Sequence, residues 1–276
     1  MSDQPQPAVH QRIADPAFRQ AVDLMDAGNT AGLEALLNQH PELTTHREAF
    51  PDRGYFQSPS LLEFIAENPV RHGRLPANAL DIARAIIANA PPPDRRSLDE
   101  TLTLVASGRV VREANVQVPL IDLLCAQGAD ADTAIEAALG HGEFDAVEAL
   151  LSNGAELTLP IAAATGRLNL AFKLLPKADS EQRHRALALS AQHGHAEITR
   201  IMLGAGEDPD RYNPPACHAH STPLHQAALA GHESVVRTLL AHGARRDLLD
   251  TIHNAPPASW ASHAGHKALA EILHGG

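Results

Sequence analysis

Residues 222–244 read TPLHQAALAGHESVVRTLLAHGA, and this stretch predicts a pair of short helices joined by a tight turn. Thr222 is a favoured residue at a helix start, and Pro223 suits the first helical position because its missing N–H would be unpaired there anyway. Apolar residues then recur three and four positions apart, which is the spacing of one helix face. Gly231 interrupts the first helix, and Gly243 is placed to end the second in a left-handed conformation. The stretch therefore describes one helical hairpin.

Weaker forms of the same hairpin recur along nearly the whole chain. A glycine, a polar residue and then an apolar stripe are found again at Gly28, Gly142, Gly166, Gly194 and Gly265. Self-similarity at intervals of 20 to 50 residues is typical of stacked helical arrays. We therefore predict one array over residues 13–276, with degenerate repeats in 13–181 and better-matching repeats in 182–276. Residues 1–12 are expected to form a disordered tail.

The hairpin in residues 222–244 resembles an ankyrin repeat, because it holds Thr-Pro-Leu-His, Ala-Ala, Gly-His, Leu-Leu and Gly-Ala in that order. Residues 60–68 and 211–225 also resemble a group of stand-alone bacterial ankyrin-repeat proteins. The resemblance implies an all-α solenoid of about eight helix-turn-helix units, some with short β-hairpin fingers. It further implies that the protein binds a protein partner through its concave face and fingers.

Composition narrows the choice of partner and compartment. Lys and Arg number 22 against 33 Asp and Glu, a net charge of −11, which disfavours nucleic acid and anionic membranes and favours a protein with a basic patch. No apolar run reaches the roughly 18 residues that a membrane helix needs, and the first residues lack a signal-peptide pattern. Two cysteines, Cys125 and Cys217, exclude a disulfide-dense scaffold. We expect a cytoplasmic monomer.

Histidine is the unusual residue, since 12 of the 17 histidines lie after residue 183. Three occupy the Gly-His position of the repeat and one the Leu-His position, so their role is predicted to be structural: His195, His232, His266 and His225. The repeat does not require the others. His141, His193 and His263 fall at the ends of first helices, on the surface where the family usually binds partners.

We expect the partner to contact residues in the fingers and at the ends of the first helices. The candidates are His141, Gln192, His193, His218, Ser221, Leu229, His253 and Trp260. Leu229 and Trp260 are the apolar anchors that an interaction hot spot would use. The alternative for Trp260 is that it packs into the last helix pair.

A metal site is the competing hypothesis. Cys217, His218 and His220 lie within four residues, and His253 of the next finger could add a fourth ligand. Structural zinc sites, however, usually take paired ligands from two distant segments, and the sequence has no second pair. Phosphate-binding loops, zinc-protease motifs and nucleophile elbows are absent from the sequence. The prediction is a non-enzymatic protein-interaction module without a cofactor, able to regulate a neighbouring protein; an enzyme that uses the histidine-lined groove remains the third hypothesis.

Overall fold

The computed structural model describes residues 12–50, 56–89 and 91–275. Its helices fall into two compact units, residues 1–155 (unit 1) and residues 156–276 (unit 2). The tail predicted for residues 1–12 lies outside the described residues except for its last position. The single array over residues 13–276 stays a prediction.

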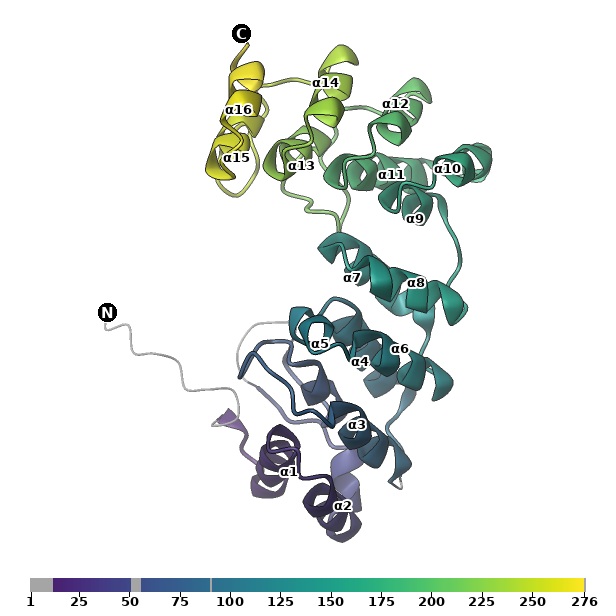
Figure 1. Ribbon diagram of the computed structural model, residues 1–276, viewed down its shortest axis with the longest axis vertical. Helices are drawn as coiled ribbons and strands as arrows, with labels where there is room; N and C mark the ends of the chain where they lie inside the picture. The colour runs from purple at the N-terminus through teal and green to yellow at the C-terminus, as the bar shows by residue number, and fades with distance from the viewer. Residues whose placement is uncertain (1–11, 51–55, 90, 276) are drawn as a thin grey trace, which may run out of the picture. The chain divides into compact units, whose positions relative to one another are not determined.

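Unit 1 is built from helix pairs of uneven length (Figure 1). The elements in order are α1 (Pro16–Asp26), α2 (Thr30–Gln39), η2 (Pro41–Thr44), η3 (Leu62–Ala66), α3 (Ala79–Ala88), α4 (Arg95–Ala106), α5 (Arg109–Glu113), α6 (Gln117–Ala126), α7 (Ala131–His141) and α8 (Phe144–Ser152). In the second pair the first helix is the 3₁₀ segment η3. Packing of α4 on η3 and α7, and of α6 on α3 and α8, stacks neighbouring pairs side by side.

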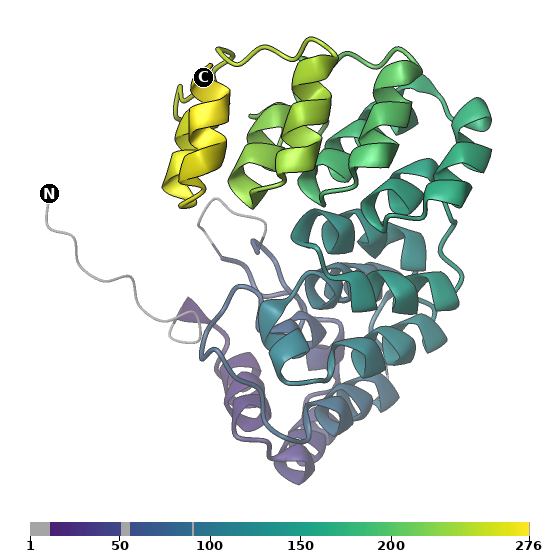
Figure 2. The same cartoon turned by 45° about the horizontal axis from the view of Figure 1, so that its top comes forward.

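Unit 2 repeats the arrangement more regularly. Its elements are α9 (Leu159–Ala164), α10 (Leu168–Leu174), η4 (Leu175–Lys177), α11 (Ser180–Gln192), α12 (Ala196–Gly204), α13 (Pro223–Ala230), α14 (Glu233–Ala241), α15 (Pro257–His263) and α16 (Lys267–His274). The first helices α9, α11, α13 and α15 pack against one another in that order, and Figure 2 shows the four pairs following in sequence. The described residues therefore form an all-α repeat architecture with about eight helix pairs, as predicted.

Small side chains allow the first helices of unit 2 to approach closely. Ala162, Ala186, Ala227 and Ala261 are all fully buried along this row. Because each repeat buries its apolar face against its neighbours, stability is distributed along the stack.

The histidines of the Gly-His positions contact the repeat that precedes their own. The His232 ring donates from Nε2 to the backbone oxygen of Gln192 at 3.1 Å, and His195 makes the same bond to Ala164 at 2.9 Å. Each ring lies so close to the glycine of the preceding turn that a Cβ there would meet it at 2.5–2.9 Å. These contacts confirm the structural role predicted for the Gly-His histidines. The three pairs are His195 on Gly166, His232 on Gly194 and His266 on Gly231.

The β-hairpin fingers expected from the resemblance are the part of the fold that was wrong. In residues 12–50, 56–89 and 91–275 the extended pairing consists of one isolated bridge between Arg47 and Ser60. The fingers are instead built from turns, and Ala216 and His218 have positive φ angles of 65° and 61° that keep the backbone out of an extended strand.

None of the helices in the described part of the protein has the length and apolar character needed to cross a bilayer.

Candidate functional site

A hollow of about 500 Å³ opens between α13, α15 and the turn that leads into α15. It is lined by Leu229, His253, Ala255, Ser259, Trp260 and His263, and we call it the Trp260 hollow. Three of its lining residues, Leu229, His253 and Trp260, belong to the predicted partner contacts. Its size falls within the range of side-chain and small-ligand pockets.

Asp250 holds the turn that forms one wall of the hollow. The carboxylate accepts hydrogen bonds from the backbone N–H groups of Ile252 (3.0 Å), His253 (2.6 Å) and Ala255 (3.1 Å). A fourth bond comes from the indole Nε1 of Trp260 at 3.1 Å. Asp250 is 1% exposed, so these donors replace its water shell. One buried carboxylate thus fixes both the turn and the tryptophan.

Two histidines of neighbouring segments fix the other side of Trp260. Its ring centroid lies 5.2 Å from that of His225 and 5.7 Å from that of His220. Trp260 is half-buried: its ring contacts His225 and His220 and also lines the hollow. These two histidines belong to the preceding repeat and its finger, and the use of Trp260 as a partner contact stays a prediction.

His225 is a structural residue with defined proton positions. Its Nδ1 accepts from the backbone N–H of Thr222 at 3.2 Å, which assigns the proton to Nε2, and Nε2 donates to the backbone oxygen of Ala255 at 3.1 Å. The bonds join the start of α13 to the wall of the hollow. His225 is fully buried, as expected for the Leu-His position.

The buried ionisable groups around the hollow are held in single charge states. Burial alone would raise the pKa of Asp250, but the four N–H donors outweigh it and hold that pKa well below its usual range. Burial lowers the pKa of His225, although its bond to Ala255 opposes the shift. Asp250 therefore stays ionised and His225 favours the neutral form.

The other residues predicted to contact a partner are not among those that line the Trp260 hollow. Ser221 is a correction: it is fully buried, and its hydroxyl donates to His218 at 3.0 Å and accepts from Gln226 at 2.9 Å, so it shapes the finger and does not face a partner. His218 is exposed on the same finger, and Gln192 and His193 are partly buried at the end of α11. His141 ends α7 in unit 1.

The candidate ligands of the alternative metal-site hypothesis are not brought together. Among the described residues, three metal-capable ligand atoms lie within 4.8 Å of one another at Asp26, Glu67 and His72, and not at any three of Cys217, His218, His220 and His253. The Cys217 side chain is buried, whereas the rings of His218 and His220 lie 6.1 Å apart and nearly perpendicular.

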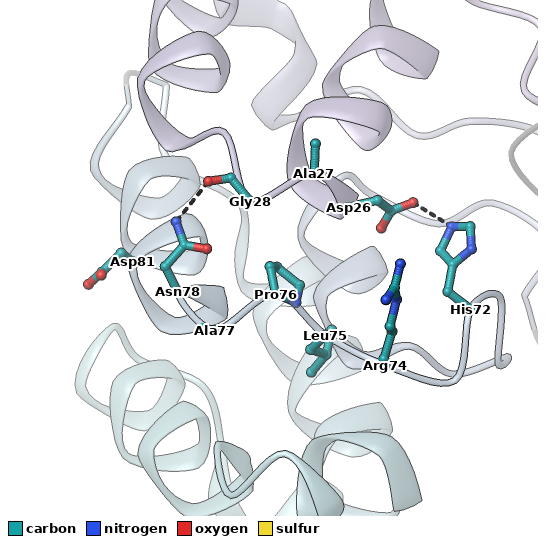
Figure 3. Close-up of a pocket in the computed structure, with 10 residues that line it drawn as sticks. All are labelled: Asp26, Ala27, Gly28, His72, Arg74, Leu75, Pro76, Ala77, Asn78 and Asp81. Carbon is teal, nitrogen blue, oxygen red and sulfur yellow. Dashed lines mark hydrogen bonds and ion pairs between the residues drawn. The ribbon is translucent and has the colours of Figure 1, made fainter.

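The cluster at Asp26 borders a larger hollow in unit 1, of about 710 Å³ (Figure 3). His72 points toward Asp26 there, with 2.9 Å between Nε2 and Oδ2. Arg71 lies 2.7 Å from Asp26 and 3.5 Å from Glu67, so a guanidinium already neutralises the two carboxylates and would repel a metal ion. We therefore assign this cluster to the structure of the loop.

Charge is divided unevenly between the units. Residues 1–155 hold 22 acidic and 11 basic residues, whereas residues 156–276 hold 11 of each. The net charge of −11 therefore belongs to unit 1, and unit 2, which carries the Trp260 hollow, is neutral when its histidines are neutral.

Sequence reasoning did not single out Asp250, Ala255 or Ser259. A signal for Asp250 was present, since Asp commonly accepts from backbone N–H groups of the residues that follow it in a turn. Ala255 and Ser259 are chemically ordinary, and only the folded turn places them at the hollow.

Comparison with known proteins agrees with this architecture. Residues 159–250 and 187–275 match the family model described as ankyrin repeats (3 copies), so the match lies in unit 2. The sequence is also 28% identical over 130 residues to cyclin-dependent kinase 4 inhibitor B of Rattus norvegicus, covering 45% of the present protein and 96% of that relative.

Proposed function

Because the chain is an ankyrin-repeat protein, we propose that it is a non-enzymatic module that binds a protein partner, with the Trp260 hollow at the centre of the contact surface. Ankyrin repeats are in general protein-interaction modules. The observation that carries the proposal is that one hollow gathers Leu229, His253 and Trp260, and that the first two of these side chains are exposed.

Exposed apolar side chains on the segments that form the hollow support the proposal. Leu229 is 38% exposed, Leu249 44% and Ile252 61%. Hydrogen bonds anchor these finger residues: the Tyr212 hydroxyl donates to the backbone oxygen of Leu249 at 2.5 Å, and the N–H of Ile252 donates to Asp250. A fixed apolar surface loses little entropy on binding, which favours its use as a contact site.

Unit 1 suggests a separate property of the partner. Its excess of 11 acidic residues favours a partner with a basic patch, because opposite surface charges speed association and select partners. We propose that the basic patch is directed at unit 1, since unit 2 has no net charge to attract it.

The relative supports a regulatory form of this function. Its name describes an inhibitor of cyclin-dependent kinase 4, and nearly its full length aligns with the present sequence. We propose that the partner here is likewise an enzyme whose activity changes when the ankyrin-repeat protein binds.

A comparative pull-down tests the proposal. Wild-type protein is compared on native lysate with a Leu229→Ala, Ile252→Ala double variant, and with Phe172→Ala as the matched control. Phe172 is 67% exposed on α10, so the control removes apolar surface from unit 2 outside the hollow. We expect one protein to be captured by the wild type and by Phe172→Ala and lost with the double variant. Equal capture by all three proteins would refute the placement of the contact at the hollow.

A further inference from the structure

The Trp260 hollow combines an apolar floor with polar atoms at its rim. Leu229, Ala255 and Trp260 supply apolar surface, and Ser259, His253 and His263 supply groups that form hydrogen bonds. Ser259, His253 and His263 are exposed, so their side chains can turn toward a bound molecule. This combination of walls suits a ligand with an apolar part and a polar part.

The two chain segments that form the hollow hold one residue of fixed charge, and its hydrogen-bonding positions are already occupied. Among residues 223–230 and 249–263, Asp250 is the one Asp, Glu, Lys or Arg, and its buried carboxylate accepts four N–H bonds. The other ionisable groups of these segments are His225, His253 and His263, and His220 packs on Trp260 from the neighbouring finger. Imidazoles are neutral or cationic and never anionic. The six residues that line the hollow therefore include three possible hydrogen-bond donors and no carboxylate.

Resting on the proposed function, we infer that the Trp260 hollow is the subsite for an aliphatic side chain of the partner that stands next to a carboxylate. The aliphatic group packs on Leu229 and Trp260, and the carboxylate accepts hydrogen bonds from the imidazoles of His253 and His263. Charged imidazole–carboxylate bonds are stronger than neutral ones, so they add selectivity to the apolar contact. The occupant is a segment with Leu, Ile or Met beside an acidic residue or at the partner's own carboxyl terminus.

The protein has one tryptophan, so its fluorescence reports directly on this hollow. We would titrate the full-length protein with N-acetyl-leucine, whose carboxylate adjoins an isobutyl side chain, and with N-acetyl-leucinamide as the uncharged match. At pH 6.0 we expect half-saturation at a concentration about threefold to fivefold lower for the acid than for the amide.

Substitutions of single histidines test which imidazoles cause the preference for the acid over the amide. His253→Gln and His263→Gln should each weaken the preference at pH 6.0, and His220→Gln tests the ring that packs on Trp260. His242→Gln is the control, because His242 is exposed at the end of α14 and outside the lining of the hollow. Circular dichroism confirms that each variant is folded.

Two results would overturn the inference. Absence of a saturable fluorescence change with either compound would show that the hollow takes no aliphatic group. Equal affinity for acid and amide at pH 6.0 would show that the imidazoles do not bind the carboxylate. Either result leaves the pull-down test of the proposed function independent, because that test depends on Leu229 and Ile252 and on no small molecule.

Discussion

Asp250 is the residue on which the geometry of the hollow depends most strongly, and replacing it by alanine gives the sharpest test. Asp250→Ala removes one buried acceptor and leaves four donors: the backbone N–H groups of Ile252, His253 and Ala255, and the indole N–H of Trp260. Hydrogen bonds to a charged group contribute about 1.5–3 kcal/mol each when buried.

The expected loss in the free energy of unfolding is smaller than the sum for four such bonds. Ile252 and His253 are exposed, so their N–H groups can turn to water once the turn loosens. The Trp260 and Ala255 donors lie on half-buried residues and recover less. Two such bonds would contribute about 3–6 kcal/mol. Because both donors regain part of this from water, we expect Asp250→Ala to lower the free energy of unfolding by about 2–4 kcal/mol.

Urea unfolding followed by Trp260 fluorescence measures this loss, because the indole is itself one of the donors. Asp247→Ala is the matched control, since Asp247 lies three residues earlier, is exposed, and pairs with Arg245 at 3.0 Å. The control should leave the unfolding midpoint unchanged. Equal midpoints for the Asp250 and Asp247 variants would refute the account of Asp250 as the organiser of the turn.

Three further outcomes follow from the same contacts. Gly231→Ala should destabilise unit 2 by about 1–3 kcal/mol, because a Cβ would meet the His266 ring at 2.5 Å and the φ of +75° disfavours alanine. Gly243→Ala, which has a positive φ and open space around it, should cost less in the same urea titration. Burial lowers the pKa of His184, so the folded state resists its protonation and stability should fall as pH drops below the unfolded value of about 6.5. Comparing midpoints at pH 7.5 and 5.5 checks this, and a His184→Leu variant should lose less stability than the wild type over that interval. Burial also raises the pKa of the Cys125 thiol to about 11, so its reaction with a disulfide reagent at pH 8 should be on the order of a hundredfold slower than that of a free cysteine. A rate close to that of free cysteine would contradict the burial assigned to Cys125.

Much of the fold could be predicted from local sequence patterns. The start of α13 at Pro223 and its end before Gly231 follow the predicted helix signals. Gly231 adopts the left-handed conformation at the helix end, with a φ of 75°. These features are local, because capping and apolar spacing act over three or four residues. The fingers were harder, since the positive φ angles at Ala216 and His218 are uncommon for residues other than glycine and no local pattern predicts them.

The candidate site was predictable only in part. Leu229, His253 and Trp260 were identified, but Ser221 was assigned to the surface although it is fully buried. A serine in a finger can face solvent or bond its own turn, and the sequence pattern is the same in both cases. The cluster of Cys217 with its neighbouring histidines looked like a ligand set because the residues are close in sequence, whereas the folded finger separates their ligand atoms.

Local sequence is sufficient to specify the repeat: helix pairs, glycines that must turn, and histidines at fixed places that bond the preceding repeat. Those properties follow from the chemistry of residues within one or two repeats. Which residues share the Trp260 hollow is a consequence of packing, because Leu229 and His263 are 34 positions apart and meet when α13 packs on α15. The role of Asp250 likewise arises from the folded state, since a carboxylate becomes the centre of a site when the fold withdraws it from water and directs four N–H groups toward it.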